Sequence, residues 1–186
     1  MTREEIELFL AVSREHYGQY YPFFLCAFRT GMRLGELLGL QWGDIDWNGR
    51  FINVQRAYKR GKMTETKTGK KCRVDMSRQL TDELQSLLKQ RKREALQDGT
   101  GKVVEVIFHK NGQPMAQNSV RYVFKKILRK AGLRDMRLHG TRHSYASILL
   151  SQGVSPVYVK EQLGHSSIQI TVDCYGTSCR VATKRR

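Results

Sequence analysis

The sequence LHGTRHSY, residues 138–145, decides how the rest of the chain can be arranged. It places His139 and Arg142 three positions apart at the opening of a predicted helix, where such side chains share one face. An apolar stripe continues this helix through Tyr145, Ile148 and Leu149. Arg142 lies in line with the stripe, and a guanidinium at the edge of a core is costly unless it meets a carboxylate, a carbonyl or a bound anion. The pair is therefore either an ordinary helix start or a site that converges on a small anion.

The composition indicates one basic domain with a real core. The 186 residues include 33 Lys and Arg against 17 Asp and Glu, a formal charge of +16. Such an excess is typical of nucleic-acid-binding proteins, although small polyanions or an acidic membrane surface would also attract it. No apolar run approaches the ~20 residues that span a bilayer, and no signal-peptide pattern opens the chain, so a membrane role is disfavoured. The four cysteines show no zinc-like or disulfide spacing, which favours a reducing cytoplasm.

The other helices are predicted from caps and from apolar residues at helical spacing. Thr2 and Glu5 form a capping box at the start of the first helix. Further helices are expected from about Pro22 to Gly31, Thr81 to Gln97, Asn118 or Ser119 to Gly132, Ser155-Pro156 to Leu163-Gly164, and from about Ser167 onward. The helix of the opening stretch is expected to end at Gly153.

Arg33 opens a short helix in the sequence MRLGELLGL, with Glu36 one turn later. The two side chains could form a plain ion pair on a solvated face. Alternatively, Glu36 orients Arg33 toward a ligand.

Residues 51–58 and 72–77 alternate apolar and polar side chains and are predicted to form two antiparallel strands. Between them lies KRGKMTETKTGKK, residues 59–71, in which Gly61 and Gly69 suit turns. This lysine-rich finger is either a solvated loop or, if it binds DNA, a contact to phosphates that does not read sequence.

Five motifs, in this order, resemble the tyrosine recombinase (phage integrase) family: TGMRLGELLGL, TKTG, LHGTRHS, LGHSS and TVDCYG. The resemblance covers nearly the whole chain. It implies an α+β fold, a mainly α-helical catalytic domain with a small antiparallel β-sheet, over residues 1–186 and without the N-terminal core-binding domain of full members. The catalytic residues that it implies are Arg33, Lys67, His139, Arg142, His165 and Tyr175.

These residue types suit phosphodiester cleavage. Arginine forks grip nonbridging phosphate oxygens, and histidines add hydrogen-bond donors to the same transition state. Tyr175, whose phenol has a free pKa of about 10, needs a basic neighbour or surrounding cations to lose its proton. The resemblance implies attack by Tyr175 on DNA to give a 3′-phosphotyrosyl bond and a free 5′-hydroxyl, with Lys67 protonating the 5′ oxygen. No metal and no cofactor is expected.

Each candidate also has a structural interpretation. Tyr175 could be a core tyrosine, because it shares a face with Ile168 and Val172. His165 could only satisfy carbonyls at the end of its helix, and His143 is expected to be structural support. The competitors of Lys67 on the same finger are Lys62, Lys70 and Lys71. Asp44 and Asp46 are interpreted as turn and cap residues rather than magnesium ligands.

The function we expect is that of a site-specific recombinase or integrase of a mobile element, with double-stranded DNA as partner. A full-length protein is expected to form a tetrameric synapse on DNA, and this fragment to be a monomer in the cytoplasm of a bacterial cell or phage-infected host. One alternative is a type IB topoisomerase-like enzyme, which reseals the same strand. Another is a basic DNA-binding module in which Tyr175 is structural. The tail after Tyr175, GTSCRVATKRR, lacks the His or Leu often found there in the family, which leaves synapsis open.

Overall fold

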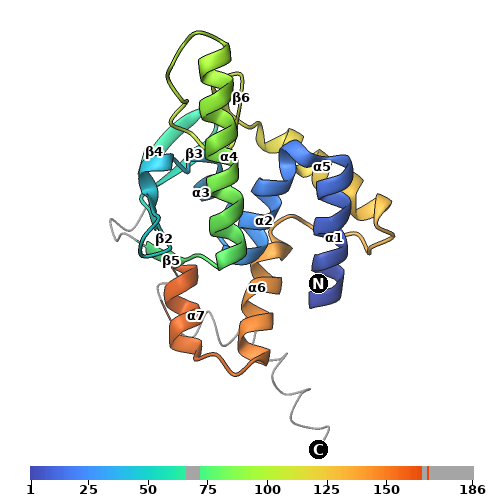
Figure 1. The fold of residues 1–186 in the computed structure, drawn as a ribbon. Helices are drawn as coiled ribbons and strands as arrows, with labels where there is room; N and C mark the ends of the chain where they lie inside the picture. Colours follow the sequence, from blue (N-terminus) through green and yellow to red (C-terminus); the bar gives the residue numbers. More distant parts are fainter. Residues whose placement is uncertain (66–71, 165–166, 168–186) are drawn as a thin grey trace, which may run out of the picture.

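The computed structural model describes residues 1–65, 72–164 and 167. The fold is mainly helical with small antiparallel sheets, as predicted (Figure 1). The α-helices are α1 (Arg3–His16), α2 (Tyr21–Thr30), α3 (Leu34–Leu38), α4 (Arg78–Gln97), α5 (Gln117–Lys130), α6 (Gly140–Ser151) and α7 (Pro156–Leu163). A 3₁₀ turn, Gly18–Tyr20, connects α1 to α2, and a second one, Trp42–Asp44, follows α3.

Most helices begin and end at capping residues that can be recognised in the sequence. Thr2 caps α1 in a reciprocal capping box with Glu5. Helix α2 ends at Gly31, which adopts the left-handed conformation (φ 63°). Ser155 caps α7, Pro156 occupies its first turn, and Gly164 ends it. These predictions are confirmed.

Two predicted helix starts are wrong. Helix α4 begins at Arg78, three residues before the expected start, because the Ser77 hydroxyl caps it by accepting from the Leu80 amide. Helix α5 begins at Gln117 after Ala116, which makes no side-chain cap, so neither Asn118 nor Ser119 is the N-cap. At this start the Gln117 side chain donates to the Tyr58 carbonyl at 3.3 Å, a contact with a distant segment that local caps do not reveal.

The strand prediction is correct for one pair and wrong for the continuity of residues 51–58. Strands β1 (Ile45–Asp46), β2 (Phe51–Val54) and β5 (Cys72–Asp75) form an antiparallel sheet in the order β1-β2-β5, with Ile52 opposite Val74. The chain leaves this sheet after Val54. Strand β3 (Arg56–Lys59) pairs instead with β4 (Lys62–Glu65), and β6 (His109–Lys110) pairs with β7 (Gln113–Pro114). The first half of the predicted finger is therefore a β-hairpin.

Asp44 holds the chain where it leaves β2 and enters β3, through its ion pair with Arg56. This buried carboxylate accepts from the Gln41 amide at 2.9 Å and pairs with Arg56 at 3.0 Å. Asp46 accepts from the Gly49 amide at 2.7 Å in the turn before β2. Both acids thus act as cap and turn residues, as predicted.

An aromatic part of the main core lies between α1, α2 and α5. Phe9 contacts the rings of Phe24, Phe28 and Phe124 with centroids 5.1–5.3 Å apart. Such tilted and edge-to-face contacts add to the hydrophobic gain of burial. This core forms the base from which α6 and α7 project.

Helices α6 and α7 pack together at one end of the molecule, and α7 lies beside β5 (Figure 1). Their own apolar cluster contains Ala146, Val159 and Leu163, with Tyr145 and Leu149 packed against it. Ile148 packs against the main core instead. The predicted stripe thus divides between two clusters, and Arg142 lies on the same helix between them.

Candidate active site

Helix α6 begins immediately after His139, which occupies its N-cap position, and Arg142 lies in its first turn. The prediction of a shared helix start is confirmed. The residue Arg142 is 3 % exposed, whereas His139 is exposed at the surface. Arg142 is therefore part of the edge of the core, and His139 faces solvent.

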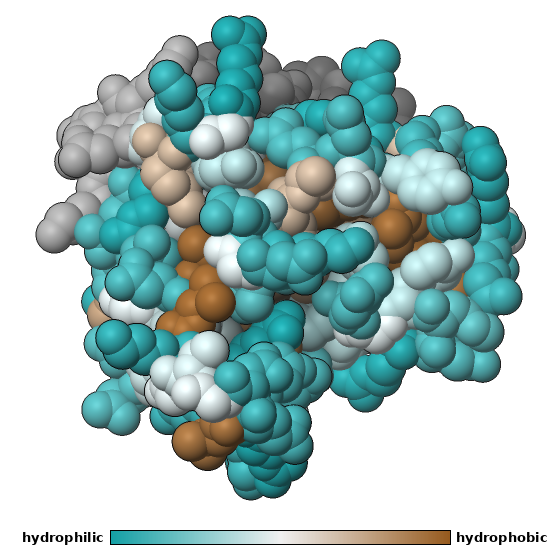
Figure 2. Space-filling view, turned by 90° about the horizontal axis from the view of Figure 1, so that it is seen from above, coloured by the Kyte–Doolittle hydropathy of each residue, from teal (hydrophilic) through white to brown (hydrophobic). Residues whose placement is uncertain are grey.

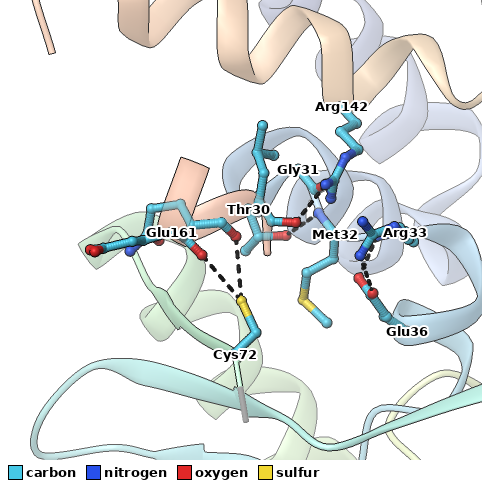
Figure 3. A network of polar contacts seen from close by, with 10 residues as sticks. Thr30, Gly31, Met32, Arg33, Glu36, Cys72, Arg142 and Glu161 are labelled. Atoms are coloured by element: carbon cyan, nitrogen blue, oxygen red, sulfur yellow. Dashed lines mark hydrogen bonds and ion pairs between the residues drawn. The ribbon is translucent and has the colours of Figure 1, made fainter. Parts of the chain in front are cut away.

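The Arg142 guanidinium donates to backbone carbonyls, which are one of the three kinds of partner expected for a buried guanidinium. Its Nη1 donates to the Gly31 carbonyl at 2.9 Å, and its Nη2 donates to the Leu163 carbonyl. These oxygens lie at the ends of α2 and α7, where helix carbonyls have no partner within the helix. The charged group therefore ties three helices together (Figure 3).

Arg33 is held by Glu36 across one turn. The carboxylate accepts from Arg33 Nη1 and from the Arg33 amide, both at 2.8 Å. The Glu36 side chain is 12 % exposed and the Arg33 side chain 48 % exposed. The structure therefore contains the i, i+3 ion pair, with its acid largely covered and its arginine side chain half-exposed.

The end of α7 lies against both Arg33 and the start of β5. A Cβ added at Gly164 would lie 4.0 Å from Arg33 Nη1 and 3.2 Å from Cys72 Sγ. The Cys72 thiol donates to the Glu161 carbonyl at 3.2 Å. Figure 3 shows Arg33, Arg142 and Cys72 gathered around this helix end. Residues that are far apart in the sequence thus converge on one region.

The electrostatics agree with that convergence. Partial desolvation lowers the pKa of His139, and the positive charges of His143, Arg142 and Arg33 lower it further. The rings of His139 and His143 lie edge to face with centroids 5.1 Å apart. Burial raises the pKa of the Cys72 thiol, which the nearby Glu36 raises further while Arg142 and Arg33 oppose it. The lowered pKa favours the neutral form of the His139 imidazole, which can act as both donor and acceptor.

A pocket of about 380 Å³ opens beside His139 and Arg142. Its lining combines apolar side chains with three basic side chains that the sequence did not single out: Arg121, Lys125 and Arg137. Lys125 donates to Asp135. The i, i+4 spacing of Arg121 and Lys125 on one face of α5, with Arg137 just before the LHGTRHS motif, is the signal that could have found them.

Three predicted site residues, Lys67, His165 and Tyr175, lie outside the described residues, as do Lys70, Lys71 and the predicted helix after Ser167. Among the six candidates, the structure therefore brings together Arg33, His139 and Arg142. Within residues 1–65, 72–164 and 167, no group of three or more His, Cys, Asp or Glu side chains is arranged to hold a metal ion. None of the helices in this part of the chain is long and apolar enough to cross a membrane.

The surface is strongly polar. Figure 2 shows a face that is mostly hydrophilic, with apolar side chains visible in scattered areas. Lys59, Arg60 and Lys62 are exposed at the tip of the β3–β4 hairpin. With a formal charge of +16, such a surface attracts polyanions.

Comparisons with known proteins agree on one family. The family model described as "Phage integrase family" matches residues 1–179. The chain is 33% identical to the tyrosine recombinase XerC-like protein of Caldanaerobacter subterraneus subsp. tengcongensis, over 82% of this chain and 44% of that protein. It is 30% identical to the ICEBs1 integrase of Bacillus subtilis, over 93% of this chain and 49% of that one.

Solved structures share the fold. The Tn1549 transposon integrase in complex with transposon right end DNA superposes with a TM-score of 0.80 at 25% identity, covering 100% of this chain and 65% of that one. The XerA recombinase superposes with a TM-score of 0.78 at 20% identity, with the same coverages. The chain spans about half the length of the curated relatives that it matches.

Proposed function

This chain belongs to the phage integrase family, the tyrosine recombinases, and from that premise we propose that it is the catalytic domain of a site-specific DNA recombinase. It cleaves and rejoins DNA strands without a divalent metal, through a covalent bond between Tyr175 and a 3′-phosphate. The observation that carries the proposal is the placement of two arginines, one buried and one exposed, around the end of α7, with His139 lining the same pocket as Arg142.

The proposed chemistry is the transfer of a phosphoryl group. The Tyr175 phenol loses its proton as its oxygen attacks the phosphorus atom, and the bond from phosphorus to the 5′ oxygen breaks. The departing 5′ oxygen takes a proton from Lys67 and leaves as a hydroxyl. Since a phosphate ester is made for the one that is broken, a 5′-hydroxyl from another strand can reverse the step without an energy source.

The described residues supply the electrostatic part of this reaction. Arg142 is fixed by carbonyls of two helices, so its fork is oriented before a phosphate arrives. Arg33, steadied by Glu36, and His139 approach the same region from α3 and from the start of α6. Donors fixed in this way, aimed at nonbridging oxygens, stabilise the charge of the pentacovalent transition state.

The partner we propose is double-stranded DNA, bound by the basic surface that includes the β3–β4 hairpin. A tetrameric synapse on DNA and a bacterial or phage-infected host are part of the same proposal for the full-length protein. For the solved relatives, complexes with DNA support it: the Tn1549 integrase was solved with transposon right end DNA.

The test is a suicide duplex with a nick close to the cleavage site, incubated with the 186-residue chain in EDTA. We expect a covalent protein–DNA band that is lost in Tyr175→Phe, which removes one oxygen and keeps the ring. A metal requirement would favour a nuclease. Trapping of DNA by a folded Tyr175→Phe variant would assign the nucleophile to another residue.

The same substrate separates the alternatives. An added strand with a free 5′-hydroxyl should be joined to the trapped 3′ end, as a recombinase requires. Relaxation of supercoiled DNA without joining of a new strand would indicate the topoisomerase-like enzyme. Binding without any adduct would indicate a DNA-binding module.

A further inference from the structure

The feature that the proposed function leaves unexplained is the set of contacts between α7 and β5. The Gln162 side chain is buried, and its Oε1 accepts from the Asp75 amide at 2.8 Å. The Tyr158 hydroxyl donates to Asp75 Oδ2 at 2.8 Å. Together with the thiol of Cys72 on the Glu161 carbonyl, these contacts fasten the last turns of α7 to the strand.

Gln162, which makes one of these contacts, is the residue before Leu163, a partner of Arg142. The Leu163 carbonyl accepts from Arg142 Nη2. The position of that carbonyl depends on where α7 ends, and β5 fixes that end. A continuous path of bonded groups thus runs from the Asp75 backbone through Gln162 to the guanidinium.

We infer that Gln162, supported by the Tyr158–Asp75 pair, is a positioning residue that aims the Arg142 guanidinium at the scissile phosphate. The inference rests on the proposed function. It differs from a role in stability because a guanidinium turned away from its target keeps its charge and its attraction for DNA. The loss should therefore fall on the chemical step rather than on binding.

Burial is what makes Gln162 effective in this role. A buried amide that loses its partner leaves an unsatisfied group, so the side chain and the Asp75 amide are held in one arrangement. Tyr158 adds a second tether one helical turn earlier, where burial and the bond to Asp75 raise its pKa to about 12, so it stays a neutral donor.

The experiment measures single-turnover cleavage of suicide duplexes that carry sulfur in place of one or the other nonbridging oxygen of the scissile phosphate. Each diastereomer changes one of the two oxygens that the guanidinium can contact, so the ratio of their cleavage rates reports how the guanidinium is aimed. Arg142→Lys, which keeps the charge but loses the fork, gives the ratio for a lost grip. We expect Gln162→Met to slow cleavage of the all-oxygen duplex roughly 10–100-fold, the size of a misplacement near 1 Å, with little change in DNA affinity.

The diagnostic result is the diastereomer ratio. In Gln162→Met it should shift from the value of the parent toward that of Arg142→Lys, and Tyr158→Phe should shift it in the same direction by less. Ser155→Ala is the matched control, because it removes the cap of the same helix, where the Ser155 hydroxyl accepts from the Val157 amide at 3.3 Å, far from the end that holds Arg142. Its ratio should equal that of the parent.

Two results would overturn the inference: a parental ratio in both Gln162→Met and Tyr158→Phe, or an equal shift in Ser155→Ala. Either would reduce the contacts between α7 and β5 to ordinary packing. If Gln162→Met does not fold, Tyr158→Phe alone decides, since it removes only a hydroxyl. Failure of the parent chain to cleave would instead refute the proposed function, so the two failures are distinguishable.

Discussion

Replacing Gly31 by alanine should destabilise the protein far more than the same change at Gly132. Both glycines follow a helix and adopt left-handed φ angles, 63° and 65°. A left-handed conformation costs an L-residue about 1–2 kcal/mol, so both variants carry this strain. Only at Gly31 would the new Cβ also collide, lying 2.6 Å from Tyr145 Cδ1 and 2.9 Å from Leu163 Cδ2. At Gly132 nothing lies within 4 Å.

The difference in stability between the two variants measures the cost of the collision alone, because the strain of the left-handed conformation is common to both. Overpacking of a core typically costs about 1–3 kcal/mol, and this is the extra loss expected for Gly31→Ala. For a chain of this size 1 kcal/mol corresponds to roughly 2–4 °C, so the melting temperature should fall by roughly 2–12 °C more than in Gly132→Ala. Thermal unfolding followed by circular dichroism measures both. DNA cleavage should also drop in Gly31→Ala alone, because the displaced groups include Leu163, whose carbonyl holds Arg142.

Equal melting temperatures for the two variants would refute this reasoning. The end of α2 would then not be packed against α6 and α7 as closely as the distances state. A further contradiction would be an intact cleavage rate in a destabilised Gly31→Ala, which would separate the packing from the orientation of Arg142.

Two other predictions concern the reaction and the surface. Lys67→Ala should cleave ordinary DNA ~10²–10⁴-fold more slowly, which is the usual contribution of a general acid. The variant should cleave a 5′-phosphorothiolate nearly as fast as the parent, since a thiolate leaves without a proton. Equal slowing on both substrates would make Lys67 a phosphate contact, and the acid would then be sought among Lys62, Lys70, Lys71 and His165. The affinity for arbitrary duplex DNA should fall steeply with salt, with a slope of log affinity against log salt concentration of about −0.9 per phosphate contacted. Binding titrations at several salt concentrations measure this slope. A constant affinity, or one sequence bound orders of magnitude better than random DNA, would contradict the prediction.

The sequence predicted what depends on neighbours along the chain. The Thr2–Glu5 capping box, the end of α2 at Gly31 and the limits of α7 are set by caps within a few residues, and all were correct. The shared start of His139 and Arg142 on α6 was predictable for the same reason.

What the sequence could not predict depends on contacts between distant segments. The strand predicted over residues 51–58 divides after Val54 because Arg56 reaches the buried Asp44 and the following residues pair with β4. The start of α5 is accompanied by a bond from Gln117 to the Tyr58 carbonyl, which alternation and caps do not reveal. The requirement of Arg142 for a partner was predictable, but its use of carbonyls at Gly31 and Leu163, 111 and 21 positions away, was not.

The dependence of Arg142 on those two carbonyls also links the proposed activity to the order of folding. The grip on phosphate needs α2 from the first part of the chain and α6 and α7 from the last part, so it cannot form while either part is unfolded. A nascent or partly unfolded chain still carries its excess of positive charge and can still adhere to DNA. It lacks the oriented guanidinium that stabilises the transition state of cleavage. Under the proposed function, such a chain would bind DNA before it could cleave it, and cleavage would begin only once the first and last parts of the fold have come together.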